Sequence, residues 1–193
     1  MANVFINEFH YDNADTDEGE FIEIAGPAGT DLSGWQIVLY NGSNGKSYET
    51  INLSGQIDDE GNGFGALSFA RAGIQNGSPD GFALVDSTGS VVQFLSYEGV
   101  FDADDGPASG MTSVDVGVEE AGTTPAGHSL QLSGTGTTSE DFSWSAPSTN
   151  SAGSINAGQT FGSTGGGDGD GNDGGDSGNA GEPTLISAIQ GSG

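Results

Sequence analysis

The sequence has no cysteine, and only two of its 193 residues, Lys46 and Arg71, are basic. Without cysteine, neither a disulfide framework nor thiol chemistry is available. Two bases cannot form the cationic patch that binding to nucleic-acid phosphates or to an anionic membrane requires, so neither partner is expected. No apolar run approaches the roughly 18 residues of a membrane-spanning helix. The N-terminus also lacks the basic start and apolar stretch of a secretory signal.

Acidic residues are abundant: 28 Asp and Glu give a net charge of -26. A surface of this charge attracts cations, including calcium, or basic partners. We also expect contact with a protein, the cell surface or the matrix.

Residues 1–162 read as one all-β domain. No segment has a helical period, and short apolar runs recur between Gly, Asn, Asp, Ser and Pro, a pattern that favours an antiparallel sandwich or barrel. Residues 41–45 and 86–90 are predicted hairpin turns. The expected strands cover residues 4–11, 20–25, 35–40, 46–53, 64–70, 81–86, 91–97, 128–132 and 141–144.

Alternation along the first run predicts two faces. One face carries Phe5, Phe9 and Tyr11, and the other carries Val4, Ile6 and Glu8.

Three glutamates, Glu8, Glu20 and Glu23, stand within expected strands, where acids are disfavoured. Two bases cannot pair with all of them. They must face water, accept hydrogen bonds or meet a cation.

The connection over residues 99–127 lacks a strong period. Loops of this length are unusual in compact domains and are often functional. We expect an excursion packed onto the domain by Val100, Phe101, Met111 and Val114.

After residue 162 the composition changes. Residues 163–181 are a Gly/Asp tract with no apolar side chain larger than alanine, which predicts a disordered, self-repelling linker. Residues 182–193 become apolar again in TLISAI. A linker joins two units, so we expect the chain to be a fragment that ends as a second domain begins.

Several motifs resemble a lamin-tail domain. INE at residues 6–8, EFIEI at 20–24 and DLSGW at 31–35 are similar to the first strands of that family, and residues 128–132 and 141–156 are similar to its last ones. The segments NGSPDGFALVD and QFLSYEG resemble the bacterial branch. The resemblance covers residues 3–157 and implies an immunoglobulin-like antiparallel β-sandwich.

In the bacterial branch the domain is commonly fused, through a Gly/Asp linker, to an OB-like region and an endonuclease/exonuclease/phosphatase domain. Residues 182–193 resemble the start of that OB-like region. The resemblance thus implies a non-catalytic accessory domain of a secreted, metal-dependent nuclease. Such a domain would be extracellular, and it would position or localise the catalytic domain of the same chain.

Two groups of carboxylates are candidate calcium ligands, since calcium takes six to eight oxygen ligands in irregular geometry. Neither follows an EF-hand pattern, and a solvated acidic turn is the alternative interpretation. A calcium-stabilised extracellular adhesion or scaffold module is accordingly a second hypothesis for function. The main group is Asp12, Asp15, Asp17 and Glu20, and the weaker one is Asp102, Asp104 and Asp105.

A third hypothesis is a hydrolase that uses His10 or His128, the only histidines. No zinc spacing, HExxH motif or phosphate-binding loop accompanies them. No catalytic or cofactor-binding residue is therefore predicted.

Overall fold

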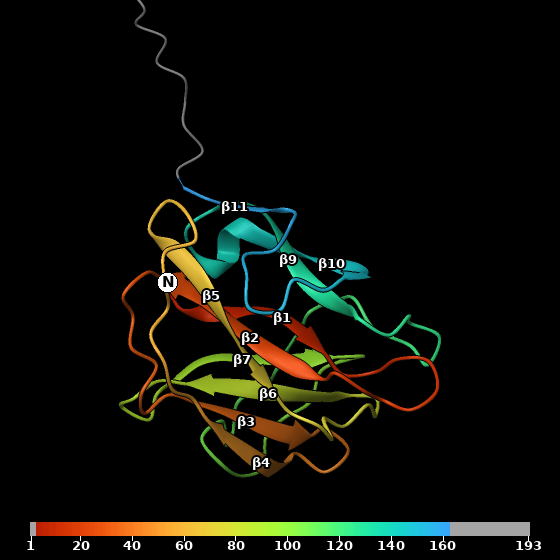
Figure 1. Ribbon diagram of the computed structural model, residues 1–193. Coiled ribbons are helices and arrows are strands. Elements are labelled where there is room, and N and C mark those ends of the chain that lie inside the picture. The colour runs from red at the N-terminus through yellow and green to blue at the C-terminus, as the bar shows by residue number, and fades with distance from the viewer. Residues whose placement is uncertain (1–2, 163–193) are drawn as a thin grey trace, which may run out of the picture.

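A computed structural model describes residues 3–162 (Figure 1). The predicted linker, residues 163–181, and the predicted start of a further domain, residues 182–193, lie outside the described residues. The described residues form two facing β-sheets, which confirms the all-β, sandwich-like class. Within them no helix is long and apolar enough to cross a membrane.

The first sheet has the strand order β10-β9-β1-β2-β5, and β11 pairs with β9 in parallel. The antiparallel pairing of β1 with β2 and of β2 with β5 places the first, second and fifth strands side by side. The strands are β1 (Phe5–His10), β2 (Phe21–Pro27), β5 (Phe64–Ala70), β9 (His128–Gly136), β10 (Phe142–Thr149) and β11 (Gln159–Phe161).

The second sheet has the order β4-β3-β6-β7-β8, with β8 parallel to β7. Both predicted hairpins are present: residues 41–45 join β3 to β4, and residues 86–90 join β6 to β7. The strands are β3 (Gln36–Asn41), β4 (Lys46–Asn52), β6 (Asp80–Val85), β7 (Val91–Tyr97) and β8 (Val114–Asp115). A short 3-10 helix, η1 (Ser139–Asp141), precedes β10.

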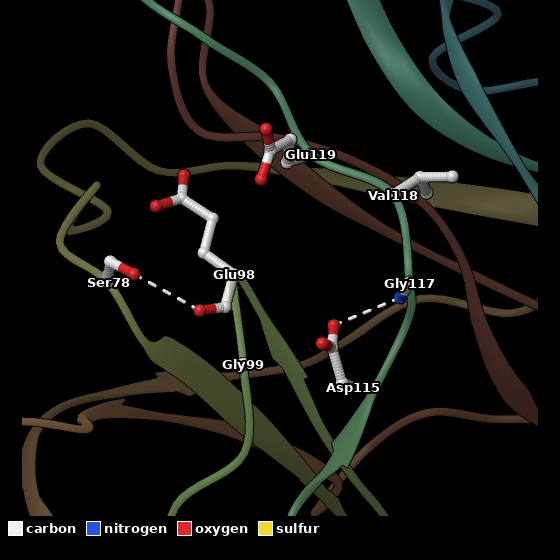
Figure 2. A pocket seen from close by; sticks show the side chains of 7 residues that line it. All are labelled: Ser78, Glu98, Gly99, Asp115, Gly117, Val118 and Glu119. Carbon is white, nitrogen blue, oxygen red and sulfur yellow. Dashed lines mark hydrogen bonds between the residues drawn. The ribbon is translucent and has the colours of Figure 1, made fainter.

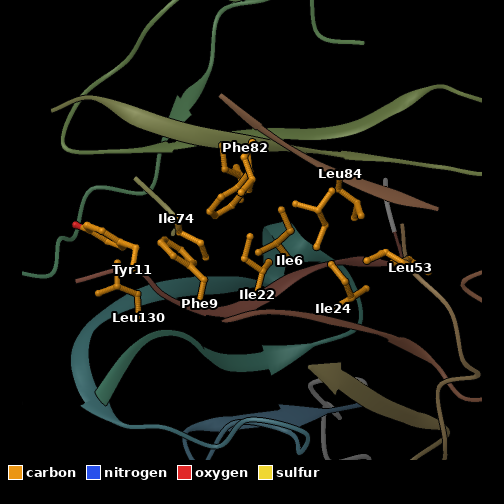
Figure 3. Close-up of a cluster of buried hydrophobic side chains, with 14 of the residues drawn as sticks. Ile6, Phe9, Tyr11, Ile22, Ile24, Leu53, Ile74, Phe82, Leu84 and Leu130 are labelled. Carbon is orange, nitrogen blue, oxygen red and sulfur yellow. The ribbon is translucent and has the colours of Figure 1, made fainter. Parts of the chain in front are cut away.

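The main core lies between the two sheets (Figure 3). Ile22 and Ile24 of the first sheet face Phe82 and Leu84 of the second, and all four are fully buried. Phe9 packs edge-on against Phe82, with ring centroids 4.9 Å apart. This layer fixes the two sheets relative to one another.

The predicted faces of the first strand are wrong. A β-bulge lies between Ile6 and Glu8, where the register with β2 shifts by one residue. The extra residue resets the alternation, so that Ile6 joins Phe9 in the main core while Phe5 packs on the opposite face. Both faces of β1 are consequently covered.

Each sheet has a second apolar cluster on its outer face. On the second sheet, Phe101 and Ala108 from the long connection cover Tyr40 and Phe94. On the first sheet, Phe5 contacts Phe142 and Phe161.

The expected packing of residues 99–127 is right only for Phe101. Val100, Met111 and Val114 are 58%, 40% and 63% exposed. A short ladder explains this for Val100 and Val114, because Asp102 bridges Thr112 and alternation places residues two apart on the same exposed side.

Candidate functional site

The acidic loop between β1 and β2 is organised by Asn13. Its buried side-chain amide donates to the carbonyls of Ala14 and Thr16, at 2.8 and 3.1 Å, and its Oδ1 accepts from the backbone N–H of Glu18 at 2.9 Å. Asp15 has a left-handed backbone, with φ 72°, at the tip. The loop therefore has a defined turn geometry.

The four predicted calcium ligands of this loop do not converge as one set. Asp12 and Asp17 lie close together. The pKa of Asp12 is raised, mainly by burial and next by the charge of Asp17. Asp15 is exposed. Glu20 is buried, and its Oε2 accepts from the backbone N–H of Gly73 at 2.6 Å. Among residues 3–162 no group of three or more His, Cys, Asp or Glu side chains is arranged to hold a metal ion.

The weaker carboxylate group is divided among local partners. Asp102 accepts from the Thr112 hydroxyl at 2.5 Å. Asp105 accepts from the backbone N–H and the hydroxyl of Ser47 at 2.8 and 2.9 Å. Asp104 is exposed, and its backbone N–H donates to the Gly45 carbonyl. Asp104 and Asp105 thus fasten the long connection to the β3–β4 hairpin, whereas Asp102 closes a contact within the connection.

His10 is 1% exposed and pairs with Glu120. Its Nδ1 lies 2.9 and 3.0 Å from the two Glu120 oxygens, and its Nε2 lies 3.1 Å from Asn13 Oδ1 and 3.1 Å from the Glu18 carbonyl. Burial lowers the pKa of His10, but the hydrogen bond and charge of Glu120, with Asn13 and Glu18, raise it overall. Acceptors on both sides of the ring fit an imidazolium that donates twice.

Glu120 also fixes the long connection to the end of β1. Its Oε2 accepts from the backbone N–H groups of Tyr11 and Asp12 at 2.7 and 3.0 Å. The Tyr11 hydroxyl accepts from the Glu120 N–H and donates to Glu98 Oε1 at 3.0 Å. His10 and Glu120 thus form a buried structural ion pair. The other histidine, His128, is half-buried at the start of β9 and belongs neither to this ion pair nor to the carboxylate groups.

Glu8 and Glu23 are neighbours across β1 and β2 and are fully buried. Glu8 accepts from Ser129 Oγ at 2.6 Å and from the N–H and Oγ of Ser151 at 2.9 and 2.7 Å. Glu23 accepts from Asn7 Nδ2 at 3.1 Å and from the Gly153 N–H at 2.7 Å. Hydrogen bonding is the outcome observed for Glu8 and Glu23. Glu20, which lies just before β2, is hydrogen-bonded through Oε2, while its buried Oε1 has no partner among the described residues.

A cleft of about 550 Å³ opens between the end of β7 and the segment that follows β8 (Figure 2). Figure 2 shows Glu98 and Glu119 on facing sides, with Asp115, the last residue of β8, below them. Its lining residues are Ser78, Glu98, Gly99, Asp115, Gly117, Val118 and Glu119.

The cleft carries uncompensated negative charge. Burial raises the pKa of Glu98, and the charges of Glu119 and Asp12 raise it further, although the Tyr11 hydrogen bond lowers it. Neither base pairs with these acids: Arg71 pairs with Glu49 at 2.7 Å, and Lys46 lies beside Asp105. A cationic group would relieve this repulsion.

Neither the role of Glu120 nor the cleft was predicted from the sequence. Glu120 lies 110 residues from His10 in the sequence. Its neighbour Glu119 is also a glutamate but is exposed. No spacing distinguishes the two. The register of the long connection on β7, where Leu95 pairs with Val114, decides which one is buried.

Comparisons of the chain with known protein families, with curated proteins and with solved structures gave no match.

Proposed function

We propose that this chain is a non-catalytic interaction domain of the lamin-tail type, and that it positions or localises a secreted nuclease through protein or surface contact. The resemblance of residues 3–157, the two-sheet fold and the acidic composition support this assignment.

One observation carries the non-catalytic assignment: the side chains that could act in catalysis are buried and hydrogen-bonded to other residues of the domain. His10 has acceptors on both ring nitrogens and is 1% exposed. Glu8 and Ser129, which share a 2.6 Å hydrogen bond, are fully buried. A general base must reach a substrate proton within hydrogen-bond distance, and these groups are enclosed.

The test of this assignment is an activity assay on the purified chain. We expect no hydrolysis of DNA or of an ester substrate, with or without magnesium or calcium. Turnover that disappears in His10→Gln or His128→Gln, with both variants folded, would overturn the proposal in favour of a hydrolase.

The interaction half of the proposal predicts a basic partner, because the net charge is -26 and the open cleft is acidic. Octalysine, measured by calorimetry, is a suitable basic peptide. We expect binding that weakens as salt is added. The double variant Asp115→Asn/Glu119→Gln should reduce the affinity more than the control double variant Asp58→Asn/Asp104→Asn. Each pair removes two exposed charges, so an equal loss would contradict a role for the cleft.

The calcium-stabilised module is the second candidate, and the proximity of Asp12 to Asp17 favours it. Both carboxylates lie at the loop end of β1, where two negative charges without a base attract a divalent cation.

A further inference from the structure

Residues 151–155, which follow β10 and lead toward β11, are bound to the outer face of the first sheet by three carboxylates in a row. The backbone N–H of Ser151 donates to Glu8 at 2.9 Å, and that of Gly153 donates to Glu23 at 2.7 Å. The backbone N–H of Ile155 donates to Glu60 at 2.8 Å. Alternate amides of one segment thus meet acids from β1, from β2 and from the loop before β5.

Within residues 3–162, no cationic side chain forms an ion pair with this row. Glu23 stands in the middle, and the charges of Glu8 and Glu60 both act on it. The other groups around it are neutral donors, Asn7 on β1 and the Gly153 N–H. Arg71 is paired with Glu49, and Lys46 lies beside Asp105.

The donors are distributed unequally between the two buried acids. Glu8 receives three hydrogen bonds, whereas Glu23 receives two, one of them a longer 3.1 Å contact. Two adjacent buried carboxylates without a cation do not both ionise at low cost. Glu23 is therefore the member that holds a proton.

We propose that Glu8, Glu23 and Glu60 form a proton-controlled clasp, which keeps residues 151–155 on the sheet while Glu23 is protonated and loosens them when that proton leaves. The proposal goes beyond the interaction function and does not depend on it.

The direction of the pH effect follows from linkage. Burial, and next the charge of Glu8, raises the pKa of Glu23 from 4.5 to about 8. The Gly153 N–H bond alone lowers that pKa, but burial is the larger effect. A closed segment that keeps water from Glu23 therefore binds the proton more tightly than an open one, and closure is favoured at low pH. It weakens progressively as the pH rises toward about 8, and it changes no further above that.

Amide hydrogen exchange on the whole chain, measured from pH 5 to pH 9 and corrected for intrinsic exchange, tests the clasp. The opening constant for the amides of Ser151, Gly153 and Ile155 should rise up to about tenfold per pH unit, and should level off near pH 8. Amides of Ile37 and Leu39 in β3 should remain more protected throughout. A pH-independent opening constant, or β3 amides that exchange in parallel with the segment, would overturn a local clasp.

Two variants and a control complete the experiment. In Glu23→Gln, whose side chain cannot ionise, the slope should disappear. In Glu60→Gln, which keeps both buried acids, the upper limit of the window should fall because one neighbouring charge is gone. Glu18→Gln, an exposed acid outside the row, should leave the profile unchanged. If Glu23→Gln does not fold, the wild-type profile and Glu60→Gln decide, and an unshifted window in Glu60→Gln contradicts the proposal.

Discussion

The two outer faces of the sandwich are covered by chemically different means. On the second sheet the long connection places Phe101, Ala103 and Ala108 on an apolar surface that includes Tyr40 and Phe94. On the first sheet, residues 151–155 are attached through backbone N–H groups to carboxylates. An apolar cover is stabilised by area removed from water, whatever the pH. A carboxylate cover depends on the protonation of its acceptors.

The largest expected effect is on the apolar cover. Phe101→Ala removes a ring that packs edge-on against Phe94 at 5.3 Å. We expect a loss of about 3–5 kcal/mol in the free energy of unfolding by urea, equal at pH 5 and pH 8. Val100→Ala, a change at the exposed neighbour, should cost less than about 0.5 kcal/mol. A loss that depends on pH would remove the distinction between the two covers.

The buried ion pair offers a sharper contrast between adjacent residues. Glu120→Gln leaves the His10 imidazolium without its anion and should cost about 3 kcal/mol. Glu119→Gln, one residue earlier and exposed, should change the free energy of unfolding by less than about 0.5 kcal/mol. Similar costs in urea unfolding would mean that Glu120 does not fix the long connection.

Global stability should fall as the pH rises from 5 to 7. Glu23 has a folded pKa of about 8 against an ordinary 4.5, so the folded state holds a proton that the unfolded state has released. The free energy of unfolding should decrease by about 2 kcal/mol over this range. His10, whose pKa is also raised, contributes in the same sense above 6.5.

The control for this pH effect is Glu23→Gln, which should remove most of the decrease. In turn acids such as Asp86, hydrogen bonds to Thr88 and Ser90 lower the pKa of the carboxyl. Their contribution to the free energy of unfolding is therefore lost only at lower pH. Stability that increases from pH 5 to pH 7 would contradict a protonated Glu23.

Calcium should have the smallest effect. Asp12 and Asp17 lie close together, but Glu20 is bound to Gly73, so few carboxylate oxygens are available to calcium. We therefore expect a dissociation constant near 1 mM, the weak end of the range for extracellular calcium modules. At 1 mM calcium we expect about 0.4 kcal/mol of stabilisation. Melting at fixed ionic strength checks this, with Asp17→Asn and Asp15→Asn as paired variants. Equal effects of calcium and magnesium in all three proteins would identify a solvated turn.

Much of the fold could be predicted because strands and hairpins leave local signals. All nine apolar runs correspond to strands, and the Asn/Gly-rich turn at residues 41–45 is a hairpin. The parallel strands β8 and β11 were not predicted, since two or three residues are too few for alternation to appear. The bulge between Ile6 and Glu8 was also missed, because it depends on the partner strand.

The sites were less predictable than the fold. Asp12 and Asp17 are close in sequence and lie close in space. Glu20 belongs to the same motif but turns to Gly73, because β2 begins at Phe21 and fixes its direction. Glu120 and Glu60 act through contacts 110 and 95 residues away, and sequence spacing carries no information on such pairs.

Residues 151–155 are bound mainly through backbone N–H groups, and the Ser151 hydroxyl adds a side-chain bond to Glu8. The side chains at residues 152 and 154 are therefore free to vary. Ala152 and Ser154 are exposed. Only Gly153, with φ 86°, has a backbone that favours its residue type. Sequence drift should therefore be rapid at residues 152 and 154 and slow at Glu8, Glu23 and Glu60. In a saturation mutagenesis screen for folding, proline should be rejected at residues 151, 153 and 155, where it removes the bound N–H, while most other replacements at residues 152 and 154 are accepted.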